Sequence, residues 1–155
     1  MTDMITAILG VIEIIPAFAK MINNRAANSK GVERGLILEM KANAELIQLY
    51  LDGDTNLDST IRQLEIEKLE KALNGDFKFT TIKKGKVSEE STGGIGFYQN
   101  YTDWTTEELF GNLFLKIEVL KKFVEMEPET FRVRKNVRLI NVLKLIKLII
   151  IHIDE

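Results

Sequence analysis

The chain of 155 residues contains no cysteine, one histidine and two prolines. Without cysteine it forms no disulfide framework, thiolate zinc site or iron–sulfur cluster and has no cysteine nucleophile. The single histidine, His152, cannot supply the pairs of histidines that acid–base or di-metal sites in helical bundles use. We interpret it as a frayed residue near the end of its helix. We therefore expect no catalytic residues, no metal, no cofactor and no enzymatic activity.

The sequence also lacks a long apolar run without charges. Crossing a bilayer as a helix takes about 20 apolar residues, and Glu13 interrupts the apolar N-terminal stretch. Asp3 stands where a secretory signal would carry positive charge, so we do not expect cleavage after the small-residue sequence Ala17–Ala19. The absence of cysteine favours a cytoplasmic protein.

The sequence lacks a large excess of charge of either sign over the whole chain. Lysine and arginine number 21 against 23 acidic residues, which gives a net charge of −2. A nucleic-acid-binding domain is usually basic, so DNA is not an expected partner. Residues 112–155 differ, because nine basic and six acidic side chains give this part a charge of +3. An anionic partner would be sought there.

Apolar residues make up 45% of the chain and recur at steps of three and four, which is typical of amphipathic helices. The length fits one domain, residues 1–155. The pattern predicts an all-α, antiparallel bundle of four to five helices with one long irregular or hairpin-like excursion at about 76–103. The helices are expected at about 5–22, 32–51, 58–73, 105–126 and 129–153.

Several local signals define the ends of these helices. Pro16 lacks a backbone donor and should kink or divide the first helix at Ile15. Thr105 and Glu108 form a capping box at the start of the fourth helix. Pro128, with Glu127 and Glu129, marks the boundary between the fourth helix and the last one, because proline is excluded from a helix interior. The polar stretch 23–31 is expected to be a connection.

Two loops resemble ligand-binding motifs only in part. Oxygen-bearing side chains alternate over residues 52–60 as in a calcium loop, but Leu57 and Gln63 stand where such a loop needs glycine and a bidentate glutamate. We interpret this loop as a turn in which Asp or Thr caps the next helix. The glycines of 93–96 are not expected to follow a strand or to open a helix, and we expect the aromatic residues of 97–101 to pack back onto the bundle.

A basic cluster begins the last helix. One interpretation is contact with an anionic partner, either the phosphates of RNA or anionic lipid. The interpretation that we favour is a solvated turn whose cations pair with Glu125, Glu127 and Glu129. The cluster consists of Arg132, Arg134, Lys135 and Arg138.

Both ends of the chain carry more apolar residues than one helix face needs. Exposing such patches in a monomer would favour association. The two helices could form the centre of the bundle, a helix-to-helix dimer interface, or a surface that meets a membrane. The run Ala7–Ile12 is similar to the opening of membrane-disrupting four-helix domains of the HeLo type, over a short part of the chain. The candidate interface residues are Ile5, Ile12, Leu145, Leu148 and Ile151.

These observations favour a non-enzymatic interaction or regulatory module that assembles through its apolar N- and C-terminal helices, as a homodimer or with another protein. The alternative is a membrane-acting bundle that exposes its apolar terminal helix. A third hypothesis is an RNA-directed, toxin-like bundle, which would need a basic cleft with a usable acid or base.

Overall fold

The computed structural model describes residues 8–10 and 13–155 and confirms the predicted all-α fold for this part of the chain. No strand occurs among these residues, and Lys86 and Thr105 form one isolated bridge. None of the helices in this part is long and apolar enough to cross a membrane. The elements are α2 (Pro16–Asn28), α3 (Gly31–Leu51), α4 (Leu57–Gln63), α5 (Glu67–Asn74), the 3₁₀ helix η1 (Phe79–Thr81), α6 (Gly96–Gln99), α7 (Thr106–Met126) and α8 (Arg132–Asp154).

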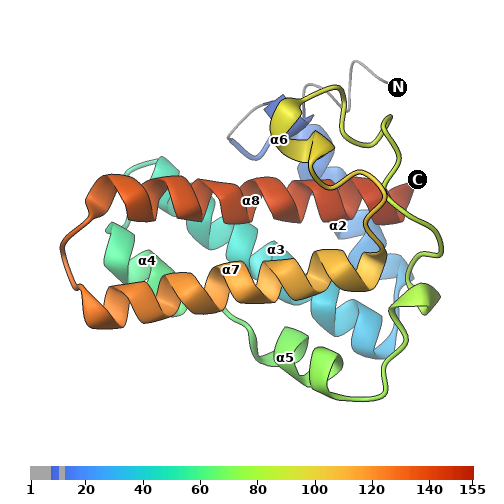
Figure 1. Ribbon diagram of the computed structural model, residues 1–155, viewed down its shortest axis with the longest axis horizontal. Helices are drawn as coiled ribbons and strands as arrows, with labels where there is room; N and C mark the ends of the chain where they lie inside the picture. The colour runs from blue at the N-terminus through green and yellow to red at the C-terminus, as the bar shows by residue number, and fades with distance from the viewer. Residues whose placement is uncertain (1–7, 11–12) are drawn as a thin grey trace.

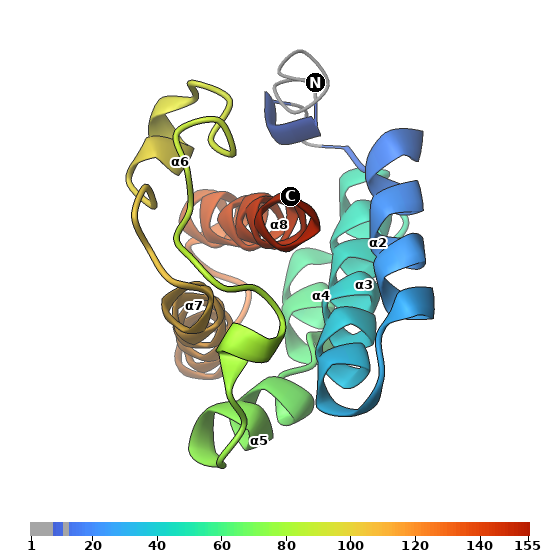
Figure 2. The same cartoon turned by 90° about the vertical axis from the view of Figure 1, so that its right-hand side faces the viewer.

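Helix α8 lies at the centre of the molecule. It runs antiparallel to α7 (Figure 1), and the end-on view places it between α7 and α6 on one side and α2 and α3 on the other (Figure 2). The chain's own helices therefore bury the C-terminal part of α8. Leu145, Leu148 and Ile151 are at most 1% exposed, so the prediction that these three form an interface between chains is wrong. Ile5 and Ile12, the other two predicted interface residues, lie outside the described residues.

The local signals located some helix ends correctly and others not. Pro16 is the first residue of α2, with Ile15 as its N-cap, and the capping box of Thr105 and Glu108 begins α7. By contrast, α2 continues through Asn28, so most of the expected connection 23–31 is helical. Pro128 lies in the turn between α7 and α8, as expected for a boundary, but α8 begins at Arg132 rather than near residue 129.

The helix predicted at 58–73 is two helices, because side chains of α3 hold the backbone between them. The amide of Asn43 donates to the carbonyl of Glu65 (2.8 Å) and accepts from its N–H (2.7 Å). The carboxylate of Glu39 accepts from the N–H groups of Lys68 (2.8 Å) and Leu69 (3.0 Å), which satisfies the start of α5. Both side chains belong to another helix, so the local sequence does not reveal that the predicted helix is divided here.

The acidic loop is a turn, as predicted, but its cap is a different residue. Asn56, rather than Asp or Thr, is the N-cap of α4, and its side chain accepts from the N–H of Ser59 (2.7 Å). Asp58 is turned inward and buried.

The excursion at 76–103 is irregular and packed rather than a hairpin. It contains η1 and α6, and Val87 and Tyr98 within it are fully buried. The hydroxyl of Tyr98 donates to the carbonyl of Leu9 (3.1 Å), which joins α6 to the N-terminal part of the chain. The aromatic residues of this segment pack back onto the bundle as predicted, and they cover apolar surface of α8 and its neighbours.

Candidate partner-binding site

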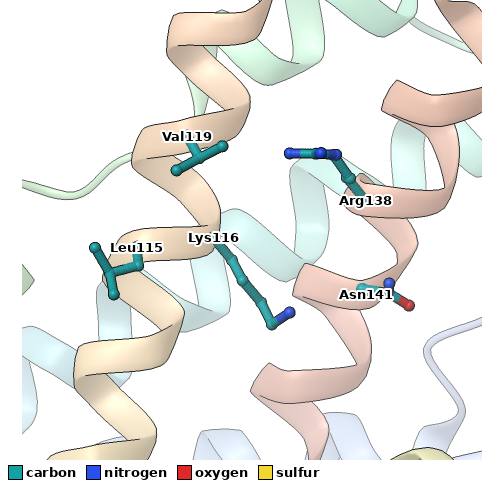
Figure 3. Close-up of a pocket in the computed structure, with 5 residues that line it drawn as sticks. All are labelled: Leu115, Lys116, Val119, Arg138 and Asn141. Atoms are coloured by element: carbon teal, nitrogen blue, oxygen red, sulfur yellow. The ribbon is translucent and has the colours of Figure 1, made fainter.

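An open groove of about 340 Å³ lies between α7 and α8. Helix α7 contributes Leu115, Lys116 and Val119, which lie within about one turn of each other, and α8 contributes Arg138 and Asn141. Figure 3 shows Lys116 extending from α7 into the space between the helices, while Arg138 points from α8 toward α7. Among the residues that the structure describes, no carboxylate lines this α7–α8 groove.

The two cations of the groove are close enough to influence each other. Burial lowers the pKa of Lys116, and the charge of Arg138 lowers it further. In the part of the chain that the structure describes, no carboxylate forms an ion pair with either side chain. Two like charges thus face one small space without a counter-charge, and a bound anion would stabilise both.

A row of stacked side chains extends the groove toward the turn between α7 and α8. The guanidinium of Arg138 lies 5.5 Å from the ring centroid of Phe123, and that of Arg134 lies 5.5 Å from the ring of Phe131. The two rings are 5.6 Å apart. We call these four residues the arginine–phenylalanine stack. Attraction between each guanidinium and its ring does not use the N–H groups as hydrogen-bond donors, so they can still bind an anion.

The backbone of the turn gives the stack its geometry. Phe131, the N-cap of α8, has a left-handed conformation with φ of 52°, and Glu129 has φ of 63°. Left-handed backbone is costly for residues other than glycine, so surrounding contacts must hold it. The carboxylate of Asp58 supplies one such contact, because it accepts from the N–H of Glu129 at 2.7 Å.

Lys135 does not belong to the exposed cationic surface, contrary to the prediction that it contacts an anionic partner. It is fully buried, and its ammonium donates to the carboxylate of Asp58 (3.1 Å) and to the carbonyl of Glu127 (2.6 Å). Burial alone would raise the pKa of Asp58, but the Glu129 N–H and the Lys135 ammonium outweigh it and hold this pKa below its usual value. The pair fastens α8 to α4.

The three arginines of the predicted cluster remain exposed: Arg132, Arg134 and Arg138. The favoured interpretation paired them with the glutamates just upstream. Among the described residues, none of these arginines forms an ion pair with Glu125, Glu127 or Glu129. The pairing interpretation is therefore wrong, and the cluster keeps charge available for a partner.

Sequence reasoning missed the apolar part of this surface. Apolar side chains of α7, of α8 and of the turn between them are partly or largely exposed, and the first two line the groove: Leu115 57%, Val119 47%, Met126 78%, Phe131 50%, Val133 79% and Val137 51%. Leu115, Val119 and Met126 were recognisable as residues off the core face of their helix, which the buried residues Leu109, Leu113, Ile117, Leu120 and Val124 occupy. The contribution of Phe123 and Phe131 was not recognisable, because it depends on how the two helices meet.

The other titratable groups with strongly shifted pKa values are enclosed in the fold. His152 is fully buried rather than frayed, and its Nε2 lies 3.0 Å from Oγ1 of Thr106. Burial lowers its pKa to about 4, and the charge of Lys83 contributes in the same direction. Burial likewise lowers the pKa of Lys147 to about 8, and its ammonium donates to the carbonyl of Glu13 (2.8 Å). Both residues stabilise contacts between elements.

Comparison with known proteins found no matching family model, curated protein or solved structure.

Proposed function

We propose that this protein is a non-enzymatic interaction module that binds an acidic segment of a partner protein at the α7–α8 groove. The observation that carries the proposal is the unpaired positive charge of Lys116 and Arg138 beside the exposed Leu115 and Val119 of α7. Interfaces combine apolar contact with polar groups that select the partner, and arginine is among the residues enriched in them. The groove offers both to an acidic partner.

The same charges argue against a symmetric homodimer through this groove. In a two-fold interface each patch faces its own copy. Lys116 and Arg138 would then meet the same cations of the second chain, and like charges brought together at an interface disfavour binding. The apolar residues expected to support a dimer at the C-terminal helix are buried in one chain. A different, acidic protein is therefore the partner that we favour.

The membrane and RNA hypotheses have less support. Membrane action would require α8 to expose apolar residues that are buried against the rest of the chain. RNA could stack on Phe131, but exposed aliphatic side chains such as Met126 and Val133 offer phosphates no contact. The cytoplasmic location stays a prediction from composition.

Titration with a fluorescently labelled, glutamate-rich peptide at low ionic strength tests the proposal. We expect measurable binding that weakens with added salt. Arg138→Glu and Lys116→Glu should each reduce the affinity for the peptide at least tenfold. Lys20→Glu is the matched control, since Lys20 is an exposed lysine on α2, on the opposite side of α8 from α7. Circular dichroism checks that each variant folds.

Equal reductions by the control and by the groove variants would contradict the proposal, because net charge alone would then explain binding. No binding by the wild-type protein, or binding that Arg138→Glu leaves unchanged, would also contradict it.

A further inference from the structure

We infer that the acidic segment bound at the α7–α8 groove is an amphipathic α-helix, with carboxylates one turn apart on one side and large apolar residues on the adjacent side. This inference rests on the proposed function and names the form of the partner. The observations that carry it are the spacing of the cations, the spacing of the apolar residues and the nature of the surface between them.

The cations of α8 are spaced like the side chains of another helix. Arg134 and Arg138 are four residues apart, which corresponds to about 6 Å along the helix axis. Carboxylates at positions i and i+4 of a second helix have the same spacing. Each guanidinium can bind a carboxylate through two parallel N–H groups. A helix lying along α8 could thus place one carboxylate on each arginine.

The apolar residues of α7 repeat with the same period. Leu115 and Val119 are also four residues apart, and both side chains are about half exposed beside the groove. A partner helix that places its acidic side on α8 would turn an adjacent side toward α7. Large apolar residues on that side would cover Leu115 and Val119, with a gain that grows with the apolar area buried.

A partner segment in extended conformation fits this surface less well. Extended peptides bind mainly by adding a strand to an exposed sheet edge, where main-chain groups are unpaired. Here the groove is formed by two helices whose backbone groups bond within each helix. Only side chains are available to a ligand, as in complexes in which a helix lies in a groove.

The arginine–phenylalanine stack reduces the conformational freedom that binding would otherwise remove. Arg134 and Arg138 are each held against a ring before a partner arrives, and the Phe123 and Phe131 rings contact each other. Groups that are already placed lose less entropy on binding. The stack should therefore make the protein bind carboxylates at this spacing more tightly than carboxylates at other spacings.

Fluorescence anisotropy with three labelled peptides of equal length and charge tests the inference. The first carries glutamates at i and i+4 on one helical side and leucines on the adjacent side. The second has the same composition with the two residue types mixed over all sides. The third is the first with two central residues replaced by proline, which prevents a continuous helix. A single-stranded RNA and vesicles of anionic lipid serve as further probes.

We expect the first peptide to bind at least tenfold more tightly than the other two and to gain helical circular dichroism on binding. Leu115→Asp and Arg134→Ala should each reduce this affinity severalfold, whereas Lys20→Ala should not. Urea unfolding of each variant shows that the surface substitutions leave the fold intact.

The remaining outcomes separate the two proposals. If all three peptides bind equally and Arg138→Glu abolishes their binding, the helical form of the partner is wrong while the acidic-segment function stands. If no peptide binds, or if only the RNA or the vesicles bind, the proposed function fails and the helix inference fails with it.

Discussion

The stability of the protein should depend on pH through its one histidine. His152 is fully buried beside Thr106, and Nδ1 of its ring has no hydrogen-bond partner in the described structure. Burial lowers its pKa from 6.5 to about 4. In the window between these values the folded protein holds the ring neutral, while the unfolded chain binds a proton. Unfolding therefore takes up a proton, and stability is lost as pH falls from 6.5 toward 4.

The size of the loss follows from the two pKa values. With 6.5 in the unfolded chain and about 4 in the folded protein, lowering the pH from 7 to 5 reduces the free energy of unfolding by about 2 kcal/mol. His152→Leu removes this titration. The ring's contact with Oγ1 of Thr106 is lost, but that hydroxyl keeps its bond to the carbonyl of Lys83 (2.9 Å). We therefore expect the variant to be close to wild type in stability at pH 7 and more stable at pH 5.

Urea unfolding, followed by circular dichroism at several pH values between 5 and 8, measures this effect. Carboxylates that titrate at low pH are common to both proteins, so they cancel when the free energy of wild type is subtracted from that of His152→Leu. The difference should be near zero at pH 7 and should favour the variant by about 2 kcal/mol at pH 5. A difference that stays constant over this range, or that favours wild type at pH 5, would refute the reasoning.

Three further substitutions test the interior and the turn by urea unfolding. Asp58→Asn leaves the ammonium of Lys135 buried without its carboxylate and should cost about 3 kcal/mol; a cost below about 1 kcal/mol would contradict this role. Lys147 has a pKa of about 8 in the folded protein and 10.5 in the unfolded chain. The free energy of unfolding of wild type should therefore rise by about 2 kcal/mol between pH 7 and 9.5 relative to that of Lys147→Met. Equal pH profiles would argue against a buried charge. Glu129→Gly relieves a left-handed residue and should stabilise by about 1 kcal/mol, whereas Glu127→Gly, at negative φ, should not.

The fold class was predictable because its signals are local. The apolar period, the proline at the start of α2 and the capping box of α7 all depend on residues close together in sequence. The division of the predicted helix 58–73 was not predictable, because Glu39 and Asn43 of α3 hold the backbone there. A local pattern cannot indicate which distant side chain will accept hydrogen bonds from its backbone N–H groups.

The candidate site was predictable only in its charge. The excess of cations in the last third of the chain pointed to α8, which contributes to the candidate groove, but one residue of the cluster, Lys135, forms a buried ion pair with Asp58. The sequence separates Asp58 from Lys135 by 77 positions, so nothing local distinguishes this lysine from Arg134 and Arg138. The phenylalanines that hold these arginines lie on α7 and in the turn before α8, and their meeting is a product of the fold.

The predicted surplus of apolar surface at the C-terminal helix is buried within the described part of the chain, and this changes where a partner can bind. The expectation of a dimer rested on the larger number of apolar residues in the end helices than one helix face needs. Instead Ile82, Val87 and Tyr98 of that segment are buried in the same core as the C-terminal part of α8. The core is therefore closed at this end. Apolar side chains remain exposed beside unpaired cations at the other end of α8, so the α7–α8 groove is the surface from which partner binding should be sought.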